Sequence, residues 1–154
     1  MKINAINSWA GYTDTNPKYF TCFAEIIMQP NILIVDDTIE FGQLVQISLK
    51  RSGLQADYVT NGQLALDYLN ERMPDVMLLD IAMPGMNGWA VLDEIKVRYP
   101  QATFPVIVLT SFNDPANKLV GKFQQQVFRY CTKPTDLKTL ANTILEATQQ
   151  PVIH

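Results

Sequence analysis

Hydrophobic positions follow two alternating patterns along most of this chain. Short apolar runs of strand length occur at residues 31–36, 56–60, 75–80, 105–110 and 126–131. Segments with apolar residues at helical spacing follow them, at about 38–51, from 61 onward, at 89–99, from 114 onward and at 135–148. Five strands that alternate with five helices are typical of βαβ units. We therefore expect an α/β fold with a doubly wound, five-stranded parallel sheet and helices on both faces.

The helical stripes also predict which side chains face the sheet. In the first helix the stripe consists of Phe41, Leu44, Val45 and Leu49, and in the last of Leu137, Leu140, Ala141, Ile144 and Leu145. Gly53 follows the end of the helix predicted at 38–51, as is common for glycine. Asn61 is a suitable N-cap for the next helix, which is predicted from residue 61 onward. Gly53 and Asn61 therefore mark the two ends of the segment between these helices, which contains the second predicted strand.

Residues 1–29 lack the alternating pattern. They contain scattered polar residues and a short apolar patch at 19–28, which Asp14, Lys18 and Glu25 flank or interrupt. A secretory signal peptide is therefore not indicated. We interpret 1–29 as an N-terminal extension, disordered or not translated if synthesis begins at Met28, with a domain at 30–150 and a short tail at 151–154.

The composition narrows the class of protein. The 154 residues are 47% hydrophobic, enough for one buried core. Twelve basic and fifteen acidic residues give a net charge of −3, which argues against direct binding of nucleic acid through bulk positive charge. Cys22 and Cys131 are too far apart in sequence to indicate a zinc site or a disulfide framework. No apolar run approaches the roughly 18 residues of a membrane span, so we expect a cytoplasmic protein with no membrane partner.

Polar side chains stand where four of the five predicted strands end. They are Asp36 and Asp37 at the end of the first strand, Asp80 at the end of the third, Thr110 at the end of the fourth and Lys133 shortly after the fifth. In an open parallel sheet the carboxyl ends of the strands form the edge where ligands bind. Three carboxylates, a hydroxyl and an ammonium are therefore predicted to meet at that edge.

This combination of groups predicts phosphoryl chemistry. Three carboxylates held together repel one another, so protons or a cation must neutralise them. Oxygen ligands without His or Cys favour a hard divalent ion such as Mg²⁺. With Mg²⁺ present, Lys133 can neutralise a phosphoryl oxygen, Thr110 can donate to another, and an aspartate can act as nucleophile. The edge is suited to accepting a phosphoryl group on an aspartate.

Residues from about 30 to 149 resemble the receiver domain of two-component response regulators, of the stand-alone type. The matching features are Asp36-Asp37, the segment Asp80-Ile-Ala-Met-Pro-Gly-Met-Asn-Gly88, Thr110-Ser111, and Tyr130 three residues before Lys133-Pro134. The resemblance implies a flavodoxin-like fold with strand order 2-1-3-4-5. It also implies a signalling switch that is controlled by phosphorylation.

Carried over residue by residue, the resemblance implies that Asp80 is the phosphoacceptor. The implied Mg²⁺ ligands are Asp36, Asp37, Asp80 and the backbone carbonyl of Ala82. Thr110 would move to the phosphoryl group, and the ring of Tyr130 would move inward behind it. Lys133 would pair with the phosphoryl group, and the Lys133-Pro134 bond is predicted to be cis, a geometry that proline makes accessible.

The resemblance further implies a sensor histidine kinase or a histidine phosphotransfer protein as phosphodonor. Because 21 residues follow Lys133, enough for one helix, output is expected through an unidentified protein partner. The expected contact face comprises the fourth helix, the fifth strand and the fifth helix. Its candidate exposed charges are Lys118, Lys122, Arg129 and Lys138. Such a protein is an enzyme only in that it promotes its own phosphorylation and slow dephosphorylation.

Three other classes of protein share part of this residue pattern. An aspartate-nucleophile phosphatase of the haloacid dehalogenase type needs a second acid two residues after its nucleophile, where this chain has Ala82. A flavodoxin-like cofactor carrier needs a phosphate-binding loop after the first strand, where Asp36 and Asp37 would repel a phosphate. A degenerate receiver that works without phosphorylation does not require the acid, hydroxyl and ammonium groups present here.

Overall fold

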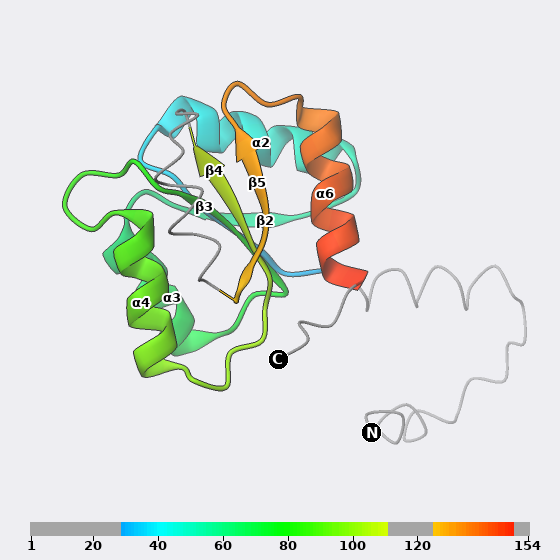
Figure 1. Cartoon of the computed structure of the whole chain (residues 1–154). Coiled ribbons are helices and arrows are strands. Elements are labelled where there is room, and N and C mark those ends of the chain that lie inside the picture. The colour runs from blue at the N-terminus through cyan, green and yellow to red at the C-terminus, as the bar shows by residue number, and fades with distance from the viewer. Residues whose placement is uncertain (1–28, 111–124, 150–154) are drawn as a thin grey trace, which may run out of the picture.

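The structure is a computed structural model that describes residues 29–110 and 125–149 (Figure 1). Its strands are β1 (Ile32–Val35), β2 (Ala56–Val59), β3 (Val76–Asp80), β4 (Val106–Thr110) and β5 (Val127–Thr132). Its helices are α2 (Ile39–Arg51), α3 (Gly62–Glu71), α4 (Gly88–Arg98) and α6 (Leu137–Gln149). Residues 1–28 of the predicted N-terminal extension, the start of the helix predicted from residue 114 and the predicted C-terminal tail lie outside the described residues.

The five strands form one parallel sheet in the order β2-β1-β3-β4-β5. This confirms the predicted fold class and strand order. The chain runs outward from β1 to β2 and then returns past β1 to β3, so the winding direction reverses between β1 and β3. The carboxyl ends of these two strands flank the position where ligands bind in such sheets.

Helices cover both faces of the sheet, α3 and α4 on one face and α2 and α6 on the other (Figure 1). Side chains alternate along each strand, so neighbouring residues enter different cores. In β1, Leu33 and Val35 pack with α3 and α4, whereas Ile32 and Ile34 pack with α2 and α6. Burial on both faces explains the nearly unbroken apolar runs of β1, β3 and β4.

Two members of the predicted helical stripes do not face the core. Leu44 of α2 is 50% exposed and Leu145 of α6 is 38% exposed, whereas Val45 and Ile144 are buried. Adjacent residues on a helix point about 100° apart, so each exposed leucine lies to one side of the central contact line. The helices contact the sheet over a narrower stripe than the sequence pattern indicates.

The loop between β3 and α4 brings the start of that helix against the end of the strand. Gly85 has φ +76, a backbone conformation that favours glycine. A Cβ on Gly88 would lie 2.5 Å from the backbone oxygen of Asp80, so only glycine permits this approach. The side chain of Asn87 accepts a hydrogen bond from the backbone N–H of Ala90 at 2.9 Å and caps the helix. These contacts fix the backbone around Asp80.

Asp136 caps the start of α6, and this cap makes a testable contribution to stability. Its Oδ2 accepts hydrogen bonds from the side chain of Thr139 at 2.6 Å and from its backbone N–H at 2.8 Å. The hydrogen bond from the Thr139 side chain is the main reason that the pKa of Asp136 lies below its ordinary value of 3.8. We expect Asp136→Ala to lower the thermal midpoint by a few degrees at pH 7.

A lowered pKa stabilises the fold above the ordinary value, and this contribution is lost as the pH falls through the native pKa. The difference between wild type and Asp136→Ala should therefore narrow below about pH 4. Asp136→Asn is the control, because asparagine keeps a cap acceptor without the charge. A difference that stayed constant down to pH 2 would show that ionisation of Asp136 does not contribute.

Candidate functional site

The carboxyl edge of the sheet brings together the three predicted acidic residues. One carboxylate oxygen from each of Asp36, Asp37 and Asp80 lies within 4.8 Å of the other two. β1 and β3 pair with Val35 opposite Leu79, so Asp36 and Asp80 follow at the same level of the sheet. Asp36 is 0% exposed and Asp80 3%, whereas Asp37 is half-buried. The cluster is open to solvent on the side of Asp37.

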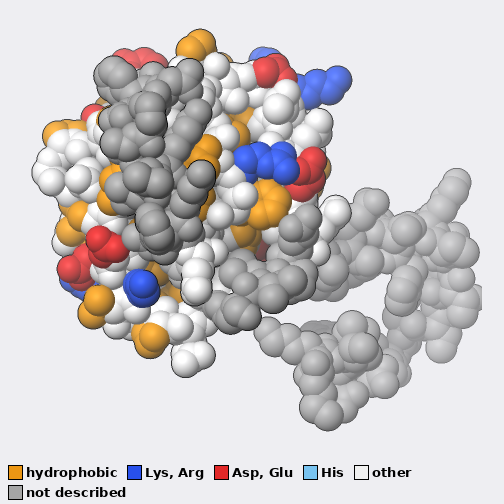
Figure 2. All heavy atoms as spheres, viewed as in Figure 1, with side chains coloured by type: hydrophobic (Ala, Val, Ile, Leu, Met, Phe, Trp, Pro, Cys, Tyr) orange, Lys and Arg blue, Asp and Glu red, His pale blue; other side chains and the backbone are white. Residues whose placement is uncertain are grey.

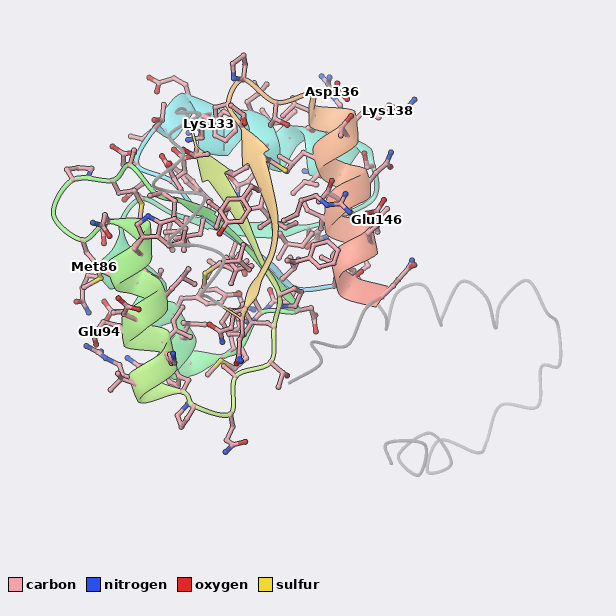
Figure 3. The ribbon with its side chains drawn as sticks, in the orientation of Figure 1. Met86, Glu94, Lys133, Asp136, Lys138 and Glu146 are labelled. Atoms are coloured by element: carbon pink, nitrogen blue, oxygen red, sulfur yellow. The ribbon has the colours of Figure 1, made fainter. Side chains whose placement is uncertain are left out.

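Lys133 contributes a positive charge to this cluster. Its Nζ forms ion pairs with Oδ2 of Asp36 and, at 3.0 Å, with Oδ2 of Asp80. The residue, labelled in Figure 3, directly follows β5. Its backbone N–H donates to the backbone oxygen of Thr110 at 2.7 Å. The Lys133-Pro134 bond is cis, as predicted. The ammonium thus lies between the two most buried acids.

Both buried carboxylates are held in orientation by backbone donors as well as by Lys133. Oδ1 of Asp36 accepts from the N–H of Thr38 at 2.9 Å, and Oδ1 of Asp80 accepts from the N–H of Ala82 at 3.1 Å. Burial raises the pKa of Asp36 above its ordinary value, and the hydrogen bond from Lys133 opposes this rise. Each acid therefore has one oxygen fixed by the backbone and the other paired with the ammonium.

The remaining predicted residues lie around this cluster at different depths. Thr110 ends β4 and is 4% exposed, one position beyond Leu109, which pairs with Asp80 in the sheet. Tyr130 of β5 packs against Trp89 of α4, with ring centroids 6.5 Å apart. Its hydroxyl is buried and has no hydrogen-bond partner among the described residues. Burial also raises the pKa of Tyr130.

Two aromatic residues at this edge were not assigned to it from the sequence. The ring of Phe41 lies beneath Lys133, whose Nζ is 4.4 Å from the ring centroid. The hydroxyl of Tyr58 donates to the backbone oxygen of Asp36 at 2.8 Å. The sequence pattern predicts Phe41 as part of the core stripe of its helix, but its position in the first turn after the Asp36-Asp37 pair also indicates a place near the carboxyl edge. The contact of Tyr58 depends on the pairing of β1 with β2, which the sequence did not specify residue by residue.

The donor set fits a hard divalent cation. All three acids offer oxygen, and the single ammonium of Lys133 leaves the cluster with net negative charge. Oxygen ligands and residual negative charge suit Mg²⁺. Asp36, Asp37 and Asp80 are therefore the residues that could hold such an ion.

This cluster predicts the effect of Asp37→Asn on the metal-free protein. At a separation of about 5 Å and an effective dielectric of about 20, two carboxylates repel by on the order of 3 kcal/mol. Solvent around Asp37 and the charge of Lys133 weaken this repulsion, so we expect the variant to be about 1 kcal/mol more stable. Thermal unfolding without Mg²⁺ tests this. Mg²⁺ should then raise the midpoint of wild type more than that of the variant. Equal responses would show that Asp37 is not a ligand.

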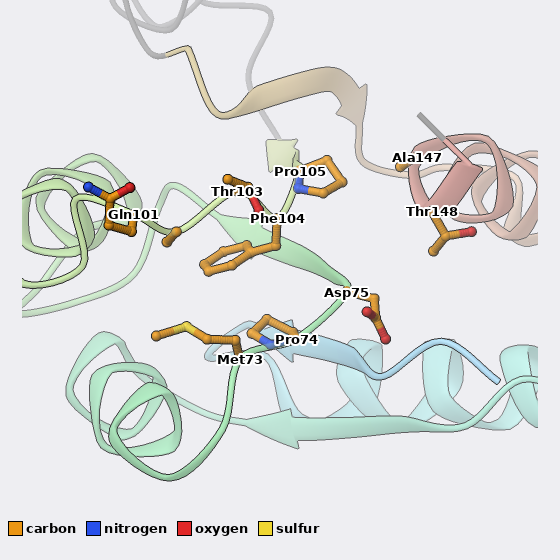
Figure 4. A pocket seen from close by; sticks show the side chains of 10 residues that line it. Met73, Pro74, Asp75, Gln101, Thr103, Phe104, Pro105, Ala147 and Thr148 are labelled. Carbon is orange, nitrogen blue, oxygen red and sulfur yellow. The ribbon is translucent and has the colours of Figure 1, made fainter. Parts of the chain in front are cut away.

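A separate pocket of about 450 Å³ opens at the opposite edge of the sheet (Figure 4). Its lining residues are Met73, Pro74, Asp75, Gln101, Ala102, Thr103, Phe104, Pro105, Ala147 and Thr148. Asp75 and Pro105 immediately precede β3 and β4, so the pocket is at the amino ends of the strands. The carboxylate of Asp75 accepts the backbone N–H of Asn31 at 2.7 Å. None of the predicted site residues lines this pocket.

The described surface mixes charges of both signs. Basic and acidic side chains are interspersed among the coloured residues of the face seen in Figure 2. Arg129 and Lys138 are exposed as predicted, and Arg129 pairs with Glu146 of α6 at 2.9 Å. Lys118 and Lys122 lie outside the described residues. Among residues 29–110 and 125–149, no helix has the length and apolar character needed to span a membrane.

Two similar proteins differ in how much of their length this chain spans. The DNA-binding transcriptional regulator NtrC of Klebsiella pneumoniae is 39% identical over 104 residues, which cover 68% of this chain but 22% of NtrC. Protein PilH of Pseudomonas aeruginosa is 34% identical over 113 residues, 73% of this chain and 93% of PilH. The chain thus spans less than a quarter of NtrC but almost all of PilH.

Solved structures and the family model agree with this fold. The receiver domain of the Francisella response regulator 1452 superposes with a TM-score of 0.71 at 25% identity, covering 79% of this chain and 98% of that one. Chemotaxis protein CheY4 of Vibrio cholerae superposes with a TM-score of 0.71 at 26% identity, and the match covers 77% of this chain and 98% of CheY4. The model of the response regulator receiver domain matches residues 32–145, a range that contains all three clustered acids and Lys133. The chain therefore belongs to the response regulator receiver domain family.

Proposed function

We propose that this domain is a phosphorylation-dependent signalling switch in which Asp80 is the phosphoacceptor. The observation that carries the proposal is the position of Asp80 at the carboxyl edge, where its Oδ2 is 3.0 Å from the Nζ of Lys133. Asp36 and Asp37 lie beside it. A buried, oriented carboxylate next to a cation and further acids suits the transfer of a phosphoryl group to an aspartate.

In the proposed reaction, a carboxylate oxygen of Asp80 forms a bond to phosphorus. The bond from phosphorus to the donor, a phosphohistidine nitrogen or the acyl oxygen of acetyl phosphate, breaks, and its electron pair leaves with the donor. Lys133 neutralises charge on the phosphoryl oxygens, and Thr110 donates a hydrogen bond to one of them. The backbone N–H of Ala82 keeps Asp80 oriented through its other oxygen.

The proposed Mg²⁺ ligands are Asp36, Asp37, Asp80 and the backbone carbonyl of Ala82. Mg²⁺ would supply charge neutralisation for the transferred group. The buried Asp36 is also paired with Lys133, so it would help to position that ammonium as well as hold the ion. Asp37, which is half-buried, is the acid most accessible to an incoming ion.

The proposed output is a change on the face formed by β5 and α6. Thr110 would turn toward the phosphoryl group, and Tyr130 would follow it. Among the residues that the structure describes, the buried hydroxyl of Tyr130 has no hydrogen-bond partner, and this supports such mobility of the ring. A sensor histidine kinase or phosphotransfer protein is the proposed donor, and a further protein reads the change.

The structure favours this function over an aspartate-nucleophile phosphatase. Such an enzyme needs an acid two residues after the nucleophile, and Ala82 occupies that position with only a backbone N–H toward Asp80. The domain would therefore promote its own phosphorylation and slow dephosphorylation without turning over an external substrate.

The decisive experiment is incubation of the full chain with acetyl phosphate, with and without Mg²⁺. We expect intact-mass spectrometry to show the gain of one phosphoryl group that depends on Mg²⁺. Borohydride reduction of the acyl phosphate, followed by peptide mapping, should locate it at Asp80. A phosphoryl group on another residue, or equal gain without Mg²⁺, would contradict the proposed site.

A further inference from the structure

We infer that Phe41 is a positioning residue for phosphoryl transfer, which holds the Lys133 ammonium in place through the face of its aromatic ring. This inference rests on the proposed function, because it concerns the group that neutralises the phosphoryl oxygens. It adds a residue outside the acid, hydroxyl and ammonium set to the machinery of the site.

The geometry encloses the ammonium from three directions. The Nζ of Lys133 is 4.4 Å from the centroid of Phe41, within the range of about 6 Å for a cation–π contact. It also pairs with Asp36 and Asp80, and the Lys133 side chain is only 13% exposed. Such a contact is stronger where water is largely excluded.

The ring of Phe41 attracts the Lys133 ammonium in a different way from the carboxylates of Asp36 and Asp80. A lysine side chain is a flexible four-carbon stem that ends in a compact charge, so its position depends on its surroundings. Asp80 changes chemically when it accepts a phosphoryl group, and its contact with Lys133 must then change. The face of Phe41 attracts the ammonium without a formal negative charge, so it orients Lys133 in both states and leaves the charge available for phosphoryl oxygens.

The fold also holds the ring in position. Phe41 lies in the first turn of α2 and packs against the core between the sheet and α2 and α6. The adjacent Gly42 is buried against Tyr58, whose ring atom would lie 2.3 Å from an added Cβ. The hydroxyl of Tyr58 in turn donates to the backbone of Asp36. Close contacts through Tyr58 therefore connect the first turn of α2, which carries Phe41, to the backbone of Asp36.

The test replaces Phe41 with 4-fluoro-, difluoro- and trifluorophenylalanine in the full chain. Each added fluorine withdraws charge from the ring face while the side chain remains nearly the same size. We expect the rate of phosphoryl gain from acetyl phosphate to fall stepwise, by about threefold to tenfold over the series. Phe41→Leu should show a loss of similar size, and the thermal midpoint of each variant shows that it is folded.

Phe128 provides the matched control. It is a half-buried phenylalanine with a cation over its ring, the guanidinium of Arg129 at 5.3 Å, but it lies near the start of β5, at the other end of the strand from Lys133. The same fluorinated residues at position 128 should leave the rate unchanged. An equal decline at both positions would overturn the inference, because it would reflect a general effect of fluorination.

A second measurement detects the contact without phosphorylation. Protons above an aromatic ring resonate upfield, so the ε-methylene protons of Lys133 should be shifted in the NMR spectrum of wild type and return toward ordinary values in Phe41→Leu. An unshifted methylene in wild type, or a flat rate series at Phe41, would overturn the inference. If Asp80 still accepts one phosphoryl group in that case, the proposed function stands. If Asp80 is not phosphorylated in wild type, the proposed function fails while the NMR shift still reports on the ring contact.

Discussion

Asparagine at position 80 is expected to abolish the gain of a phosphoryl group from acetyl phosphate, with a rate at least on the order of 10³-fold below that of wild type. An amide matches the carboxylate in shape but is a poor nucleophile, and it carries no charge to attract a cation. The fold should persist in Asp80→Asn, because Lys133 remains paired with Asp36. Intact-mass spectrometry over a time course measures the rate.

Asp75→Asn is the matched control for this variant. Asp75 immediately precedes β3, at the other end of the strand from Asp80, and its carboxylate accepts the backbone N–H of Asn31. It lies at the amino edge, away from the clustered acids, so the exchange should leave phosphoryl gain unchanged. Undiminished gain in Asp80→Asn, or loss of gain in Asp75→Asn, would contradict the assignment of Asp80.

Lys133→Met should produce the largest loss of stability among these variants, about 3 kcal/mol in the free energy of unfolding without Mg²⁺. Methionine has a similar length but no charge, so Asp36 and Asp80 would remain buried together with no cation between them. Removing one partner of a buried ion pair is costly because the other charge stays uncompensated. Urea unfolding followed by circular dichroism measures the loss.

Two further variants test whether the loss of stability in Lys133→Met comes from its ion pairs with Asp36 and Asp80. Lys138→Met removes an exposed lysine at the start of α6 (Figure 3) and should change stability by no more than about 0.5 kcal/mol. Asp36→Asn combined with Lys133→Met should recover part of the loss, because the most buried unpaired charge is then absent. Mg²⁺ should likewise stabilise Lys133→Met. Equal stability of wild type and Lys133→Met would show that the ion pairs contribute little.

The sequence by itself determined the fold class and the edge at which the site lies. Apolar runs of strand length and the helical stripes between them are local patterns, since the side-chain period of each element is a property of its backbone. The polar residues Asp36, Asp80 and Lys133 interrupt or follow apolar runs, and parallel strands place all their carboxyl ends at one edge. The order of the strands and the assignment of a role to each residue came from the resemblance to receiver domains.

The contacts between different helices and strands could not be predicted from these local patterns. Leu44 and Leu145 fit the helical stripes but are exposed, because the width of the buried stripe depends on how each helix crosses the sheet. The packing of Tyr130 on Trp89 depends on where α4 lies relative to β5. Neither relation is encoded in the period of a single element.

The same reason explains the environment of Lys133. The sequence placed this residue at the carboxyl edge, but only the tertiary structure decided that its ammonium lies between Asp36 and Asp80 and over the ring of Phe41. Asp36 directly follows β1, Asp80 ends β3 and Phe41 lies in α2, so the positions of these partners depend on strand pairing and on the angle of a helix. A sequence pattern determines which face a side chain occupies. The packing of distant segments determines which atoms it meets, because those contacts are made only after the elements are assembled.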